Sequence, residues 1–364
     1  MHSPTTGSDG GSSQPNAGDK QTYSMMAADP ERDRQAILDC WNEGLTHGGQ
    51  PEAKFDWYYL RHADGVPEVH FLRHADHAEA VGVAGVSARP MRYGSESVAV
   101  GEIVDFVVSP KHRTLFPAIF LQREINRLGM EKRELLYGLP NKQSEAVLRR
   151  VGYKLVGQMV RRVRVLRSAE YLARHIPAWT AKLAGPLIDR VRAAAVSLRR
   201  LWTGGFRSQW QDKADARFDD LWQRAVMPGT LVGVRDSKFL NWRFADCPLG
   251  KYAFLTVCTA VGQLVAYAVC EVQQQGLHVH DFLVDPNARG AWTRLWLDLA
   301  HEAFSKGGTT LSTEFLGSDA MQAELQAQGL LAREQRPFYV IASDNWADRL
   351  QAQHWYVTAA DEDG

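Results

Sequence analysis

A strand–turn–helix block occurs twice in this chain, and the repeat constrains the fold more than any other feature of the sequence. Residues 105–113 read DFVVSPKHR and residues 281–289 read DFLVDPNAR, so five of nine positions are identical at a constant offset of 176 residues. Each block is a short apolar run, a proline turn and an arginine that precedes an amphipathic helix, expected over 117–128 and 292–306. A repeated supersecondary unit predicts two halves built to one plan.

The similarity extends on both sides of the repeated block. Upstream, residues 54–57 read KFDW and residues 238–242 read KFLNW. Downstream, Leu139-Pro140-Asn141 and Leu316-Gly317-Ser318 each open a helical segment, with the offset changed by one residue. One loop insertion explains that change. We therefore weigh shared ancestry above a chance match between two strand–turn–helix units.

Composition limits the classes of protein to which the chain can belong. With 364 residues and 45% hydrophobic content, the chain is long enough for two domains that each have a core. The formal net charge is zero and the isoelectric point is near 7.2, which favours no nucleic-acid partner. The four cysteines lack metal-ligand spacing, and the polar first residues contain no apolar leader, so we expect a reduced, cytoplasmic protein.

The order of predicted elements indicates a mixed-sheet α/β fold in tandem. Each unit should contain a helix, antiparallel strands, a strand that feeds a helix through a tight turn, and then strand, helix and strand. The apolar run 252–270 is long enough to suggest a membrane span, but Gly262 and its neighbours form a turn signal and favour a hairpin. The expected regions are a disordered tail (1–29), a first unit (30–167), a basic helical linker (168–212) and a second unit with a C-terminal extension (213–364).

The repeated blocks, followed by segments opening at Leu139 and Ser318, resemble the GCN5-related N-acetyltransferase (GNAT) superfamily in tandem arrangement. The resemblance implies two acyl-CoA N-acyltransferase units. In that family a loop of the form Arg/Gln-x-x-Gly-x-Gly/Ala holds the pyrophosphate of coenzyme A on backbone amides. The first unit keeps Arg113 and Ala118 but has Phe116 in place of the middle glycine, and Pro117 removes one amide donor.

The second copy departs further from the family loop, because Trp292 and Arg294 stand where small residues are expected. The resemblance therefore places acetyl-CoA, or another acyl-CoA, in the first unit as a co-substrate, with no metal. The family's tyrosine acid is replaced by Leu148 and Leu325, neither of which can transfer a proton. The residues implied for the cofactor are Val107, Val108, Arg113, Thr114, Leu115, Phe116, Ala118 and Asn141.

Acyl transfer to an amine needs a group that accepts the amine proton. Glu102 and Asp105 are the candidates in the first unit, and strand alternation predicts that they lie on opposite faces. Asp281 recurs at the position equivalent to Asp105, which also fits a structural hydrogen bond present in both units. The histidines at 70, 74 and 77 lack a third ligand at fixed spacing, which favours a polar turn over a metal site. The aromatic residues at 57–59 are expected either to anchor a helix or to line an acceptor pocket.

The resemblance implies transfer of an acyl group from coenzyme A to a small-molecule amine. Tandem proteins of this kind resemble enzymes of bacterial envelope polysaccharide pathways, which makes an amino sugar the preferred acceptor by analogy. Two alternatives remain open. One is a Fem-like aminoacyl transferase, and the other is a pair of degenerate units that act as a binding or scaffold module.

The segment 161–207 has eleven basic residues against two acidic ones. Its apolar positions follow helical spacing, and Gly185-Pro186 predicts a break between two short helices. One interpretation is an inter-domain helix pair with its apolar face packed on the units and its arginines in solvent. The other is peripheral contact with an anionic membrane surface.

Overall fold

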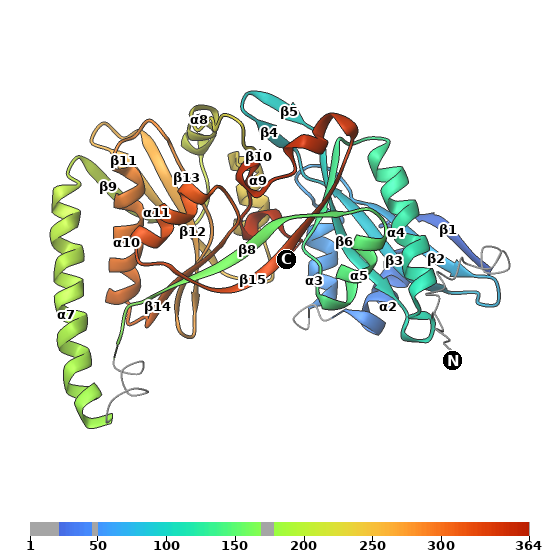
Figure 1. The fold of residues 1–364 in the computed structure, drawn as a ribbon, viewed down its shortest axis with the longest axis horizontal. Coiled ribbons are helices and arrows are strands. Elements are labelled where there is room, and N and C mark those ends of the chain that lie inside the picture. The colour runs from blue at the N-terminus through green and yellow to red at the C-terminus, as the bar shows by residue number, and fades with distance from the viewer. Residues whose placement is uncertain (1–21, 46–49, 169–177, 364) are drawn as a thin grey trace, which may run out of the picture.

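Two α/β units lie side by side and share one continuous sheet (Figure 1). The computed structural model describes residues 22–45, 50–168 and 178–363. The sheet has twelve strands in the order β1-β2-β3-β6-β7-β15-β8-β14-β13-β12-β11-β9. Parallel pairs, such as β6 with β7 and β13 with β14, occur among antiparallel ones, so the expected mixed α/β fold in two units is confirmed.

The first unit follows the predicted order of elements. Its helices are α2 (Arg34–Gly44), α3 (Pro51–Tyr58), α4 (Leu115–Met130) and α5 (Lys142–Arg150). Its strands are β1 (Tyr23–Ala28), β2 (Glu68–His74), β3 (Ala80–Ala88), β4 (Met91–Tyr93), β5 (Glu96–Val98), β6 (Val100–Val108), β7 (Leu135–Gly138) and β8 (Lys154–Val165).

The second unit repeats this order after a long helix. Its helices are α7 (Ala178–Trp202), α8 (Ala216–Arg224), α9 (Ser237–Leu240), α10 (Ala291–Ser305) and α11 (Asp319–Ala327). Its strands are β9 (Phe206–Gln211), β10 (Leu231–Gly233), β11 (Tyr252–Thr259), β12 (Leu264–Gln273), β13 (Gly276–Val284), β14 (Thr310–Phe315), β15 (Leu331–Ala342) and β16 (Trp355–Tyr356).

The two units exchange their last long strands. Strand β15 of the second unit pairs with β7 of the first, while β8 of the first unit pairs with β14 of the second. The exchanged strands also pair with each other, antiparallel, at the centre of the sheet. In Figure 1 they cross between the two halves, so each half is completed by a strand from the other. The repeat alone does not predict this exchange.

A second contact between the units is built from the repeated aromatic segments. Trp57 and Trp242 stack with ring centroids 5.2 Å apart, and the indole N–H of Trp57 donates to the carbonyl of Trp242 at 2.8 Å. Both side chains are buried. Trp57 and Trp242 thus connect the two units, a role that the sequence did not predict. A small sheet in the order β16-β10-β4-β5 also joins the units.

Three expectations about the connecting regions need correction. Residues 23–28, predicted as part of a disordered tail, form β1, because alternating side chains let this segment pair with β2 along its edge. Residues 206–211, predicted as part of a helical linker, form β9 and extend the sheet beside β11. The break expected at Pro186 does not occur, since α7 continues through this residue to Trp202. Residues 1–21 and 169–177 of the predicted tail and linker lie outside the described residues.

The apolar run 252–270 forms the hairpin of β11 and β12, as predicted. Among the described helices, none combines the length and apolar character that crossing a membrane requires. All four cysteines are buried free thiols.

Candidate functional site

An open cleft lies where β6 and β7 separate in the first unit. These parallel strands pair only over Val100–Glu102 and Leu135–Tyr137, and the residues beyond diverge. The space between them has a volume of about 300 Å³. Its lining includes Leu45, Lys54, Glu102, Ile103, Asp105, Phe106, Gln122, Gly138, Leu139, Asn141, Ser144, Leu148, Glu362 and Asp363.

A bulge in β6 brings both predicted carboxylates into this cleft. Two residues of β6, Asp105 and Phe106, stand opposite one residue of β3, and Asp105 has φ of 48°. A left-handed backbone is costly for a residue with a side chain and is found mostly at functional or tightly constrained positions. The bulge also shifts the alternation of side chains. The expectation that Glu102 and Asp105 lie on opposite faces is therefore wrong, because both line the same cleft.

Asp105 is held by two buried partners on and just after α3. The Lys54 ammonium lies 2.8 Å from one carboxylate oxygen, and the Tyr59 hydroxyl donates to the other at 2.8 Å. Burial alone would lower the pKa of Lys54, but the charges of Asp105 and Asp363 outweigh it and raise that pKa. Lys54 is therefore a permanent cation at the base of the cleft, and Asp105 is its counter-ion.

Glu102 lacks a cationic partner among the described residues. Its carboxylate accepts one hydrogen bond, from the Tyr58 hydroxyl at 3.2 Å, and its side chain is buried. Burial raises the pKa of Glu102 well above the ordinary range, and the negative charge of Asp363 adds to the increase. The fold therefore increases the affinity of Glu102 for a proton.

Two further carboxylates reach the cleft from the end of the chain. Asp363 lies 3.5 Å from the Lys54 ammonium, and its side chain is about one-third exposed. Glu362 is held by Arg336 of β15 at 2.7 Å. Sequence reasoning missed both, although the acidic run 361–363 was visible as a signal. Nothing in the sequence showed that the last residues of the second unit cross to the first.

The residues predicted to hold the cofactor divide into three groups. Asn141 lines the cleft, and its side chain caps α5 by accepting from the amides of Gln143 and Ser144. Val107 and Val108 are buried beyond the cleft in β6. The rest, from Arg113 to Ala118, form the loop and first turn at the start of α4. The Thr114 side chain does not cap this helix, so it does not compete with an anion for the first-turn amides.

The equivalent region of the second unit is filled by the chain itself. Strands β13 and β14 pair over Gly276–Val279 and Thr310–Thr313 and then separate in the same way. Residues 355–361 pack at this point. Val357 forms a β-bridge with Leu316, and the Tyr356 hydroxyl donates to the carbonyl of Phe282. Tyr356 is buried, so the chain's own C-terminal segment occupies this region.

The repeated aspartate has a different environment in this second region. Asp281 is fully buried and lies 3.0 Å from the guanidinium of Arg235, which also contacts Asp361 at 2.6 Å. Tyr267 and Thr358 donate to Asp281 at 2.7 and 2.6 Å. Every carboxylate oxygen is thus engaged in an internal network, and Asp281 has a structural role.

One position accounts for part of this contrast. The offset of 177 residues that aligns Leu139 with Leu316 makes Gly138 of the first unit equivalent to Phe315 of the second. Gly138 lines the open cleft, whereas the buried ring of Phe315 packs 5.0 Å from that of Tyr356. A glycine leaves space between the strands, and a phenylalanine fills it.

The histidine cluster differs from the expected one. His74 and His77 lie near His112, at ring distances of 5.0 and 4.9 Å, and His112 shares a hydrogen bond with the Tyr23 hydroxyl. In the described part of the chain, no group of three or more His, Cys, Asp or Glu side chains is placed to hold a metal ion.

Comparisons with solved structures decide the fold. A GCN5-related N-acetyltransferase from Kribbella flavida superposes with a TM-score of 0.61 at 16% identity, covering 90% of this chain and 73% of that one. A tandem GNAT protein from the clavulanic acid biosynthesis pathway superposes with a TM-score of 0.51 at 11% identity, covering 88% and 98%. The chain has the tandem GNAT fold.

A third GNAT structure is a glucosamine N-acetyltransferase region in a fungal multi-domain β-N-acetylglucosaminidase. It superposes with a TM-score of 0.53 at 9% identity and covers 88% of this chain and 38% of that one. No protein-family model and no curated protein sequence matches the chain. The likeness to GNAT proteins therefore lies in the fold.

Proposed function

We propose that the chain is an acyl-CoA-dependent N-acyltransferase whose first unit carries out the reaction. The observation that supports this best is the cleft at the divergence of β6 and β7, which is open in the first unit and lined by carboxylates. The same point in the second unit is filled by Phe315 and Tyr356. Among the described residues, the first unit is therefore the one with space for a thioester beside a proton acceptor.

The start of α4 suits the phosphates of an acyl-CoA. Its first-turn amides lack a side-chain cap, and Arg113 is exposed beside them. A helix N-terminus stabilises an anion through its amides and its dipole. The amides of Leu115, Phe116 and Ala118 would bind the pyrophosphate, and Val107, Val108 and Asn141 would flank the remainder of the cofactor.

Glu102 is the proposed general base. Glu102 first accepts a proton from the bound ammonium group, and the neutral amine then attacks the thioester carbonyl. The intermediate collapses with release of the thiolate, and the nitrogen loses its second proton to water. The thiolate then takes a proton from water. A raised pKa makes Glu102 a better acceptor than an ordinary carboxylate. Asp105, fixed by Lys54 and Tyr59, is a positioning residue that holds the bulge.

The acceptor that fits the cleft best is a cationic amine. Glu362 and Asp363 join Glu102 and Asp105 there. These four carboxylates face two cations, Lys54 beside Asp105 and Arg336 beside Glu362. A negative site raises the local concentration of a protonated amine. The fungal region that resembles this chain acts on glucosamine by its name, and an amino sugar of envelope polysaccharide synthesis remains our preferred acceptor. Free cysteines and an acyl-CoA substrate both suit the cytoplasm.

The test combines acetyl-CoA calorimetry with an assay that follows release of the coenzyme A thiol. Glu102→Gln keeps the shape of the side chain but not its proton affinity, so the rate should fall about 10²- to 10⁴-fold while acetyl-CoA affinity is unchanged. Asp105→Asn is the matched comparison and should disturb stability as well as rate. No binding of acetyl-CoA by the wild-type chain would favour the scaffold alternative, and transfer from aminoacyl-tRNA alone would favour the Fem-like one.

A further inference from the structure

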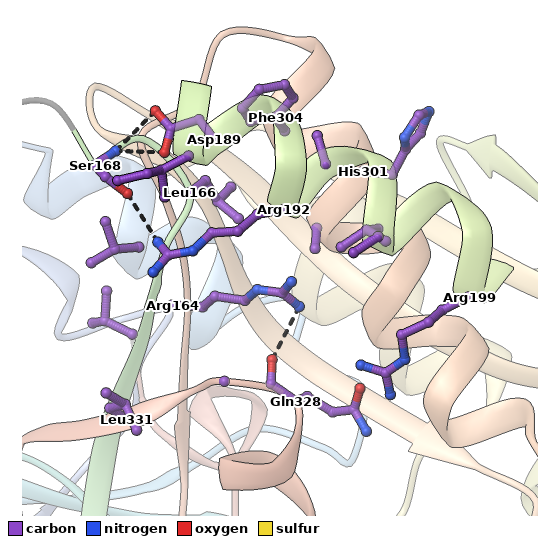
Figure 2. A pocket seen from close by; sticks show the side chains of 18 of the residues that line it. Arg164, Leu166, Ser168, Asp189, Arg192, Arg199, His301, Phe304, Gln328 and Leu331 are labelled. Atoms are coloured by element: carbon purple, nitrogen blue, oxygen red, sulfur yellow. Dashed lines mark hydrogen bonds between the residues drawn. The ribbon is translucent and has the colours of Figure 1, made fainter. Parts of the chain in front are cut away.

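A second pocket, remote from the cleft, lies beneath α7 (Figure 2). It has a volume of about 580 Å³ and is bounded by α7, the C-terminal part of α10, β8 and the turn after α11. Figure 2 shows Arg192 and Arg199 extending from α7, and Arg164 from β8, toward the same space. Arg333 and His301 also line the pocket. Five side chains that are basic or can become so thus surround one cavity.

These arginines are not neutralised by the protein. Asp189 is the one acidic side chain of the lining, and both its oxygens accept the amide of Ser168, at 2.9 and 3.0 Å. Arg164 donates to the carbonyl of Gln328 at 3.0 Å, and Arg192 donates to the Ser168 hydroxyl at 2.9 Å. Within the described ranges, no carboxylate forms an ion pair with Arg164, Arg192 or Arg199.

The arrangement is electrostatically unfavourable without an anion. Burial lowers the pKa of Arg164, and the charges of Arg199 and Arg192 lower it further. Like charges gathered in a partly buried site repel one another. An anion between the guanidinium groups would convert this repulsion into charge-assisted hydrogen bonds.

The remaining wall of the pocket is apolar. Leu166 and Val196 are buried, and Phe304 and Ile188 are partly buried around them. A small inorganic anion would leave this wall uncovered. The combination of guanidinium groups on one side and apolar side chains on the other matches a ligand with an anionic head and an apolar body.

We propose that this pocket binds a phosphate ester that carries an apolar group. A phosphate monoester has between one and two negative charges at neutral pH, which suits three unpaired arginines. Such a ligand comes either from a lipid headgroup or from a soluble phosphorylated metabolite, and the two share the chemistry that the pocket recognises.

Calorimetry of the full chain with dodecyl phosphate, below its micelle concentration, tests the site. We expect binding, weakened about tenfold by Arg164→Gln and by Arg199→Gln, and unchanged by Arg190→Gln, an exposed arginine of α7 outside the pocket. Dodecanol should not compete, and inorganic phosphate should bind more weakly. Thermal unfolding should show that Arg164→Gln is at least as stable as wild type, because it relieves repulsion.

Two results would overturn the proposal: no binding of dodecyl phosphate by wild type, or equal weakening by Arg190→Gln. Vesicles that contain phosphatidic acid separate the two sources. Release of the protein from these vesicles by dodecyl phosphate identifies a lipid headgroup as the ligand. Binding of dodecyl phosphate with no competition at the vesicles identifies a soluble ester.

A separate observation concerns the opposite face of α7. Leu187, Val191, Leu198, Leu201 and Trp202 are between 56% and 84% exposed. Figure 1 places α7 at one end of the molecule with no described element on its outer side. The interpretation in which the apolar face of the linker packs on the units is therefore wrong for Leu187, Val191, Leu198 and Leu201. These side chains point away from the pocket that Arg192 and Arg199 line.

We propose that this outer face of α7 attaches to an anionic membrane surface. Of the four arginines from residue 184 to 202, Arg192 and Arg199 line the pocket and Arg200 pairs with Asp298. Arg190 is exposed outside the pocket, one helical turn after Leu187. An apolar stripe that ends in an exposed tryptophan and has a cation beside it is typical of a helix lying in the lipid interface. Each cation near such a surface contributes about 1 kcal/mol to binding.

Co-sedimentation with vesicles tests this attachment. We expect binding to phosphatidylserine vesicles at low salt, weakening at high salt and no binding to phosphatidylcholine alone. Leu198→Asp, at an exposed site, should abolish binding without unfolding the chain, whereas Val261→Asp, an exposed apolar residue of the β11–β12 turn, should not. No binding at low salt, or a concentration-dependent dimer that Leu198→Asp disrupts, would overturn the proposal.

Discussion

The first and second units begin from the same nine-residue block, but the space beyond it is open in one and closed in the other. In the first unit, β6 and β7 diverge around Glu102, Asp105 and Gly138. In the second, the same divergence holds Phe315 and Tyr356. The closed side contains an ion network around Arg235 that is sealed from solvent. The same architecture thus forms an open cleft in the first unit and a filled, ion-paired interior in the second.

The C-terminal segment connects these two outcomes. Residues 355–361 fill the divergence in the second unit, and Glu362 and Asp363 then enter the cleft of the first. The segment that closes one site therefore supplies carboxylates to the other. The filled second unit thus stabilises and completes its partner, and four pairs of substitutions measure how far this division goes.

The largest effect is expected from making the first unit resemble the second. Gly138→Phe should abolish acetyl-CoA binding in calorimetry, because the ring would occupy the cleft. Gly138→Ala is the control, since an added Cβ would meet its nearest neighbour, Leu148, at 3.6 Å, an ordinary contact. Retained binding by a folded Gly138→Phe protein would place the cofactor elsewhere.

The buried ion pairs should differ in their contribution to stability. Arg235→Met leaves Asp281 and Asp361 without their shared cation and should lower the free energy of unfolding by about 3–5 kcal/mol. Lys54→Met should cost less, because water in the cleft can reach Asp105. Urea unfolding of both variants measures the difference. Equal losses would show that the cleft is as dry as the core.

Acid should affect both units through one buried histidine in each. Burial, reinforced by nearby cationic groups, lowers the pKa of His62 and of His278 to about 3. Between pH 6.5 and 3 the unfolded chain, with a histidine pKa near 6.5, binds a proton at each of these positions and the folded chain does not. Stability should therefore fall as pH drops from about 6.5 toward 3, by about 2 kcal/mol per histidine between pH 7.5 and 5.0.

Urea unfolding of His62→Gln and His278→Gln at these two pH values checks this expectation. Each variant should lose the same share of the pH dependence, in a single transition, because the sheet is continuous across the units. Two separate transitions would show that the halves unfold independently.

The smallest effect concerns two exposed arginines at equivalent positions. Arg113→Glu places a negative charge beside the proposed phosphate loop and should weaken acetyl-CoA binding about tenfold. Arg289→Glu makes the same change in the closed unit and should alter affinity less than twofold. Equal losses by calorimetry would contradict the assignment of the cofactor to the first unit.

The repeat allowed most of the fold to be predicted, since strands and helices alternate with clear periodicity within each unit, whereas the segment between the units was predicted less well. The site was harder to predict. Spacing alone put Glu102 and Asp105 on opposite faces, and only the bulge, with its left-handed residue, brings them together. Local sequence contains no reliable signal for a bulge at an aspartate.

The pairing of strands that are far apart in the chain also could not be predicted from the sequence. The exchange of β8 and β15, and the path of residues 355–363 across the molecule, depend on contacts between segments far apart in the chain. The orientation of α7 is another example. Its periodicity predicted helical structure but not one continuous helix, and it left open whether the apolar face turns toward the units or away from them.

The crossed pair of β8 and β15 has a mechanical consequence. Each half of the sheet ends on a strand that belongs covalently to the other half, so a cut anywhere between β8 and α7 would leave two fragments that remain interlocked. Separating them requires breaking the ladders of β7 with β15, β8 with β15 and β8 with β14, and also that of β4 with β10. Either fragment alone would expose an unpaired sheet edge and bind its partner or itself to cover it. The two halves should therefore stay associated after the chain is cut between them.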